Sequence, residues 1–168
     1  MIVSRVYIPA TLAMLEQLVA EATMHPRSGT AFAVTPALRE SYTEGDDEEL
    51  AEVALGEAAL ASLRLLAGEQ EPRLRRAVLE VDVPDSDVTV RPDLDDAVVR
   101  LAGPVSLDQV VAAYVDNAGA EPAVRAAIGV IDDADLGDED AELTVGDAQD
   151  HDLAWYAAQE LPFLLELL

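Results

Sequence analysis

A long helix with clear ends, followed by an alternating strand, restricts the folds open to this chain. Residues 46–68 read DDEELAEVALGEAALASLRLLAG, in which Asp46 and Glu49 have the spacing of a capping box and a glycine ends the pattern. Acidic residues in the first turn also lie at the positive end of the helix dipole. The next stretch, residues 73–83, carries apolar side chains at every second position: Ala77, Leu79, Val81 and Val83. The sequence therefore predicts a helix followed by a strand that has one polar side.

Shorter elements are predicted on both sides of this pair. β-Branched and aromatic residues predict strands over 3–9, 30–35, 97–103, 112–117, 141–145 and 152–156. Helical spacing predicts helices over 12–22, 36–42, 106–110 and 122–131, with a terminal helix that starts near Leu161 because Pro162 cannot lie deep inside one. Thr11 and Thr35 are the expected N-caps. The last two strands are expected to form a hairpin, and residues 84–96 read as a loop.

Three segments repeat a similar order of elements, which bears on the topology. RVYIPATLAML, VRLAGPVSLDQV and AWYAAQELPFLL each read as a strand, a short linker, a polar residue followed by leucine, and a helix. Such units favour an α+β fold with a mainly antiparallel or mixed sheet, helices largely on one face, and one or two ferredoxin-like βαβ units. We expect a single domain over residues 1–168, within which 1–84 and 97–168 form two pseudo-halves.

Composition excludes several classes of function. With 34 acidic residues, 10 arginines and no lysine, the net charge is -24, which opposes binding to nucleic acids and anionic membranes. The chain has no cysteine, and no signal peptide or membrane span is recognisable. We therefore expect a cytoplasmic protein, present as a monomer or small homo-oligomer. No motif for a cofactor or a catalytic residue is recognisable, and none is predicted.

The most acidic segment runs from residue 132 to 152 and contains ten carboxylates and one histidine. A calcium loop needs carboxylates at its positions 1, 3 and 5, glycine at 6 and glutamate at 12. When Gly137 is placed at position 6, Ala134 and Leu136 fall at positions 3 and 5, so the motif fails. A solvated surface is favoured over a site for divalent cations. His151 is better explained as a surface histidine than as a metal ligand, and no metal site is predicted.

The charge-balanced N-terminal region is the better place for a ligand. The turn PRSGT could present backbone N–H groups to an anion, although it lacks the spacing of a P-loop and also fits an ordinary β-turn. The candidate binding residues are the polar side chains of this region: Arg5, Tyr7, Arg27, Ser28, Thr30, Thr35 and Arg39. The arginine-rich stretch 73–76 is expected to pair with nearby acidic residues.

Several phrases of the sequence resemble one known family. RVYIPAT, RSGTAFAVTPALRE, DLGDEDAE and HDLAWYAAQELPFLLELL, spread over nearly the whole chain, are similar to a family of small actinobacterial proteins known only as a domain of unknown function. The resemblance implies a cytoplasmic protein of a GC-rich bacterium. It implies no activity, cofactor or functional residue.

Three hypotheses follow. The leading one is a non-enzymatic, acidic domain that binds a basic protein partner. The alternative is a domain that binds a small molecule or an anion through the Arg/Ser/Thr cluster of residues 5–39, with enzymatic activity left open. A third, weaker alternative is binding of divalent cations by residues 132–152.

Overall fold

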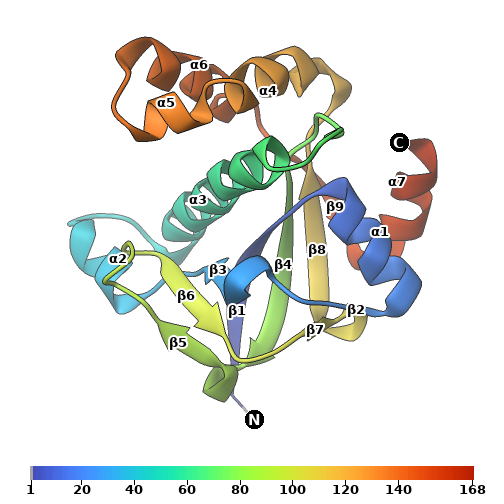
Figure 1. Ribbon diagram of the computed structural model, residues 1–168. Coiled ribbons are helices and arrows are strands. Elements are labelled where there is room, and N and C mark those ends of the chain that lie inside the picture. The colour runs from blue at the N-terminus through green and yellow to red at the C-terminus, as the bar shows by residue number, and fades with distance from the viewer. Residues whose placement is uncertain (1) are drawn as a thin grey trace.

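The computed structural model describes residues 2–168 and contains one seven-stranded sheet (Figure 1). The strands follow the spatial order β5-β6-β3-β1-β4-β8-β9, and all neighbours pair antiparallel. Their bounds are β1 Val3–Ala10, β3 Thr30–Phe32, β4 Ala77–Pro84, β5 Val88–Val90, β6 Val98–Leu101, β8 Val110–Val115 and β9 Ala154–Ala157. β2 (Thr23–Met24) and β7 (Val105–Ser106) form a separate two-stranded sheet. The predicted α+β class with a mainly antiparallel sheet is confirmed.

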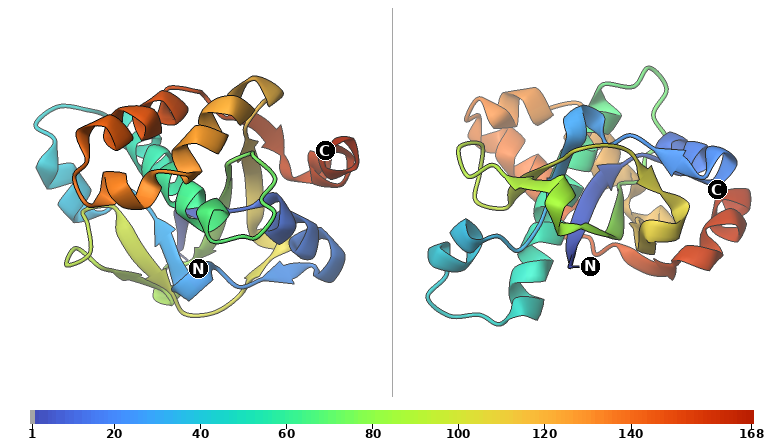
Figure 2. Two further views of the ribbon diagram at one scale, coloured as in Figure 1. Left: turned by 45° about the horizontal axis from the view of Figure 1, so that its top comes forward. Right: turned by 90° about the horizontal axis from the view of Figure 1, so that it is seen from below.

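Most of the helical residues lie on one face of this sheet, in two layers. α3 (Asp47–Ala67) crosses the sheet, and α4 (Glu121–Ile128), α5 (Ile131–Asp135) and α6 (Glu139–Gln149) pack on the side of α3 that faces away from it (Figures 1 and 2). α1 (Leu12–Glu21) and α7 (Leu161–Leu167) cover the opposite face, and α2 (Pro36–Ser41) lies near the start of α3. None of these helices is long and apolar enough to cross a membrane.

Alternating side chains divide the core between the two faces. On β4, Leu79 and Val81 pack with α1 and α7, whereas Val78 packs with α3. On β1, Ile8 belongs to the first cluster and Tyr7 to the second. This is the period-two pattern of a strand, and it assigns every second residue of β1 and β4 to the α3 face.

One of the crossovers in the sheet joins β3 to β4. β3 and β4 both pair antiparallel with β1, so they run in the same direction with β1 between them. Their connection contains α2 and α3, which makes β3-α3-β4 a split βαβ unit of the ferredoxin-like kind. The sheet also interleaves distant parts of the chain, because β6 lies beside β3 and β8 lies beside β4.

The predicted helix ends are confirmed at atomic level. The side chains of Thr11, Thr35 and Asp46 accept hydrogen bonds from the backbone N–H groups three residues on, at 3.3, 3.1 and 2.9 Å. α7 begins at Leu161, with a proline in its first turn. These caps are encoded locally, which explains why the sequence reveals them.

Two predicted elements are wrong. Residues 141–145 form part of α6 and are not a strand, because Asp138 caps a helix by accepting from the N–H of Ala141 at 2.9 Å. Ala141, Val145 and Ala148 are then buried at helical spacing against α3 and α4. The expected hairpin therefore does not form, and β9 pairs with β8 instead. Residues 84–96, read as a loop, contain the edge strand β5.

A buried ion pair joins the sheet to the α6 layer. The guanidinium of Arg76 donates from Nε and Nη2 to the two carboxylate oxygens of Asp116, both at 2.8 Å, and both side chains are almost fully buried. Arg76 also donates to Oε1 of Gln149 at 2.9 Å and to the carbonyl of His151 at 2.8 Å. The other arginines of the 73–76 stretch form ion pairs as expected, Arg73 with Glu16 and Arg75 with Glu121.

Candidate functional site

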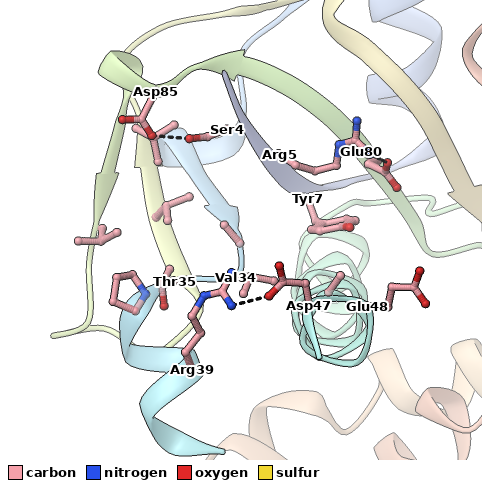
Figure 3. Close-up of a pocket in the computed structure, with 16 residues that line it drawn as sticks. Ser4, Arg5, Tyr7, Val34, Thr35, Arg39, Asp47, Glu48, Glu80 and Asp85 are labelled. Carbon is pink, nitrogen blue, oxygen red and sulfur yellow. Dashed lines mark hydrogen bonds and ion pairs between the residues drawn. The ribbon is translucent and has the colours of Figure 1, made fainter. Parts of the chain in front are cut away.

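A cleft of about 790 Å³ opens where β1 and β3 separate (Figure 3). The register joins these strands at Tyr7 and Phe32, after which β3 ends and the chain turns toward α2. The first half of β1 is thus left beside a gap, with β5 and β6 on its far side and the start of α3 at one end. The cleft exists because β3 is too short to continue the sheet.

Arg5 forms one wall, and its charge is already neutralised. Its Nε and Nη2 donate to the carboxylate of Asp82 at 2.8 and 2.9 Å, and its Nη1 donates to Glu80 at 2.8 Å. These hydrogen bonds from Arg5 lower the pKa of the Asp82 carboxyl. Because both of its bonding edges are occupied, the guanidinium has little capacity to hold a further anion.

Glu80 connects this wall to two tyrosines. Its second oxygen accepts a hydrogen bond of 2.8 Å from the hydroxyl of Tyr114, whose pKa is raised by burial and by that bond. Burial and the charge of Glu80 likewise raise the pKa of Tyr7, a largely buried residue whose ring lines the cleft. Both phenols are therefore neutral at physiological pH and offer hydrogen-bonding groups without charge.

The opposite wall is built by α2 and α3. Arg39 of α2 pairs with Asp47 in the first turn of α3, which closes the lower end of the cleft (Figure 3). The Thr35 hydroxyl donates to the carbonyl of Asp96 and accepts from the N–H of Leu38. Thr35 therefore shapes the wall as a helix cap, and its hydroxyl is occupied by the protein itself.

Carboxylates outnumber cations around the cleft. Arg5 and Arg39 line it together with four acidic residues: Asp47, Glu48, Glu80 and Asp85. Within residues 2–168 neither Glu48 nor Asp85 forms an ion pair, and Asp85 accepts a hydrogen bond of 2.5 Å from the Ser4 hydroxyl. The remaining lining is mostly apolar, from Ala33, Val34, Val88, Val90 and Val99. The cleft thus combines an apolar wall with excess negative charge.

The structure brings together four of the seven candidate binding residues. Arg5, Tyr7, Thr35 and Arg39 line the cleft. Arg27, Ser28 and Thr30 lie elsewhere: Arg27 and Ser28 are in the turn that leads into β3, and Thr30 is the first residue of that strand. In that turn the carbonyl of Ser28 accepts a hydrogen bond of 2.9 Å from Arg100.

Glycine is needed in this turn for two reasons. Gly29 has a φ of +69°, and a Cβ at this position would lie 3.0 Å from the carbonyl oxygen of Leu101. The turn is therefore packed directly against β6.

Sequence reasoning missed the acidic members of the site. Glu80 and Asp82 lie on the polar side of β4, and the register places Tyr7 opposite Glu80 and Arg5 opposite Asp82. The alternation of polar residues on β4 is visible in the sequence, but the strand with which β4 pairs, and the register of that pairing, are not. The sequence identifies Glu48 only as one of the acidic residues in the first turn of the helix.

The acidic segment 132–152 does not converge on a point. Its carboxylates are distributed over α5, α6 and the turns at their ends, and His151 is exposed. Among residues 2–168 there is no group of three or more His, Cys, Asp or Glu side chains arranged to hold a metal ion. The hypothesis of a divalent-cation site thus finds no set of ligands in the part of the chain described.

Comparison with known proteins places the chain in a family. The model of the "Family of unknown function (DUF6912)" matches residues 4–165, nearly the whole sequence. The chain belongs to this family. The predicted membership in an uncharacterised family is confirmed, and the description of DUF6912 assigns no activity to its members. No curated protein and no solved structure matches the chain significantly.

Proposed function

We propose that the chain is a binding domain for a small organic molecule that carries a positive charge, held in the cleft between β1, β5, α2 and α3. One observation carries the proposal: both arginines of the cleft are already paired with carboxylates, whereas Glu48 and Asp85 have no cationic partner within residues 2–168. An ammonium or amidinium group would supply the missing charge.

The same arrangement disfavours an anionic ligand. An anion would have to displace Asp82 and Glu80 from Arg5, or Asp47 from Arg39, while being repelled by the remaining carboxylates. Of the two ligand types considered for this region, a small molecule or an anion, the charge balance favours a small molecule that is a cation.

The size and the apolar wall fit this class of ligand. Pockets for small molecules usually enclose about 300–1,000 Å³ and combine apolar surface with a few polar groups. Here the volume is about 790 Å³, and the valines of β5 and β6 provide the apolar surface. An apolar body would lie against these valines, with its charged end directed toward the carboxylates.

Two probes that differ in charge test the proposal. Phenethylamine and 3-phenylpropanoate share an apolar body, and their binding can be followed by amide chemical shifts in two-dimensional NMR. We expect saturable shifts with the amine that map to residues 33–36, 47–51 and 85–90, and none there with the carboxylate. Equal shifts with both probes, or amine shifts spread over the whole surface, would contradict the proposal.

A matched pair of variants removes the effect of overall charge. Glu48→Gln with Asp85→Asn should weaken amine binding about 5-fold per carboxylate, which corresponds to about 1 kcal/mol for a charge near a protein surface. Glu142→Gln with Asp147→Asn removes the same charge from the exposed surface of α6 and should leave the affinity unchanged. Equal losses in the two variants would show that only the net charge of the chain attracts the amine.

A further inference from the structure

The strand β9 leaves one edge of the main sheet open. It is the last strand in the spatial order, and its residues pair with β8 on one side, with Trp155 opposite Tyr114. Within residues 2–168 no strand pairs with its other side. An edge of this kind presents backbone N–H and C=O groups that can form a ladder with an added strand.

An exposed aromatic side chain and a cavity accompany this edge. Trp155 is 58% exposed although it is the largest side chain of β9. Its cross-strand neighbour Tyr114 lines a cavity of about 590 Å³, which continues along Asp152 and Leu153 to Glu52 on α3. A side chain reaching over β9 from an added strand would find an aromatic ring first and carboxylates behind it.

The charge around the edge has a single sign. Asp150 and Asp152 precede β9, Glu160 follows it, and residues 126–168 contain no arginine. Arg76 is the one arginine that lines the cavity, but Asp116, Gln149 and the carbonyl of His151 already occupy its guanidinium. The negative field along β9 is therefore not compensated locally.

We propose that the β9 edge binds an extended basic segment of a partner protein as an added strand. The backbone of the segment pairs with β9, the aliphatic part of a lysine or arginine packs on Trp155, and its charge lies near Asp152 and Glu52. Charge complementarity selects this occupant. Antiparallel pairing of β9 with β9 of a second copy would bring Asp152 of each chain close to Glu160 of the other, so like charges oppose that occupant.

Trp155 provides a direct readout, because it is the only tryptophan of the chain. The probe is an acetylated and amidated peptide of sequence Thr-Lys-Val-Lys-Val-Lys-Thr, titrated while tryptophan emission is recorded. We expect a saturable shift of the emission, which is lost in high salt because screening shortens the range of the charges. The peptide with glutamate in place of each lysine should produce no shift.

Two further comparisons separate strand addition from general attraction to an acidic surface. Replacing a valine beside the central lysine of the peptide by proline removes one backbone N–H and leaves the charge unchanged. If the peptide forms a ladder with β9, this replacement should abolish most of the shift in tryptophan emission. Asp152→Asn should lower the affinity for the lysine peptide about 5-fold, whereas Asp133→Asn on α5 should leave this affinity unchanged. Equal binding of the proline peptide, or equal effects of the two variants, would overturn the proposal.

Light scattering tests the competing occupant. The chain should show no dimer that depends on Trp155. A concentration-dependent dimer that Trp155→Ser abolishes would make a second copy the occupant and would overturn the proposal. Neither result tests the proposed binding of an amine in the cleft between β1, β5, α2 and α3 (the amine cleft), because β9 and Trp155 do not line that cleft.

Discussion

Replacement of the buried Arg76, which directly precedes β4, by methionine should be among the most damaging single changes in the chain. Arg76 and Asp116 are each 1% exposed, and three N–H groups of the guanidinium are directed at Asp116 and the carbonyl of His151. Methionine fills a similar volume but leaves the Asp116 carboxylate with the backbone N–H of residue 76 as its remaining partner. The change therefore creates a buried charge without a counterion.

The magnitude follows from the burial of the pair. Removing one partner of a buried ion pair costs about 3–5 kcal/mol, because the other charge stays desolvated. For a chain of this length each kcal/mol lowers the melting temperature by about 2–4 °C, so a decrease of about 6–20 °C is expected. Reversible urea and thermal unfolding followed by far-UV circular dichroism measures both quantities. Arg73→Met is the control, because its ion pair with Glu16 is solvent-exposed and should contribute about 1 kcal/mol or less.

A double variant decides whether the uncompensated charge is the cause. Arg76→Met combined with Asp116→Leu removes both charges, and apolar replacements of buried ion pairs are often neutral or stabilising. We therefore expect the double variant to recover most of the stability that Arg76→Met loses. If the double variant is as unstable as the single one, or if Arg76→Met costs less than the Arg73→Met control, the reasoning is refuted.

Two smaller effects are also expected. Burial, with a contribution from Asp95, raises the pKa of Glu57 in the folded state. The contribution of Glu57 to the free energy of unfolding is therefore present below its unfolded-state pKa and is lost as pH rises through its folded-state pKa. Glu57→Gln should therefore raise the melting temperature at pH 7 more than Glu142→Gln does, and this difference should vanish near pH 3.5. Ser62→Ala should cost about 1–3 kcal/mol in urea unfolding, because its buried hydroxyl donates to the carbonyl of Ala10 at 2.7 Å and accepts from the N–H of Ala77 at 3.1 Å.

Elements with local signals could be predicted from the sequence. α1, α2 and α3 each begin with a side chain that caps the helix, β1 contains β-branched and aromatic residues, and β4 alternates between apolar and polar residues over most of its length. Such signals depend on neighbours within four residues, so they need no knowledge of the fold. The α+β class follows from these elements in turn.

Residues 141–145 show why other elements could not be predicted. Glu-Leu-Thr-Val is compatible with a strand, and the capping by Asp138 competes with that reading in the sequence alone. The contacts of Val145 and Ala148 with α3 and α4 favour the helix, and these partners come from sequence positions far away. Leu143 is 70% exposed in the helix, so its apolar character misled the prediction.

The candidate site was predictable only in part for the same reason. Arg5 and Tyr7 are two residues apart on one strand, so their common face could be expected. Glu80 and Asp85 lie beside them only because β1 pairs with β4, a strand about 75 residues further along the chain, in one particular register. The sequence therefore indicates arginine side chains in this region, whereas the carboxylates that lie around them depend on the register between β1 and β4.

The pairing of the arginines bears on the charge of the ligands proposed above. Within residues 2–168, seven of the ten arginines form ion pairs: Arg5, Arg39, Arg64, Arg73, Arg75, Arg76 and Arg91. A paired guanidinium has less capacity to hold an anion, whereas most of the acidic residues have no cationic partner within residues 2–168. The amine cleft and the β9 edge use this same excess at separate places. Asp85→Asn should therefore weaken binding of the amine and leave binding of the basic peptide unchanged. Asp152→Asn should weaken binding of the peptide and leave binding of the amine unchanged. A change in net charge alone cannot produce this pair of results.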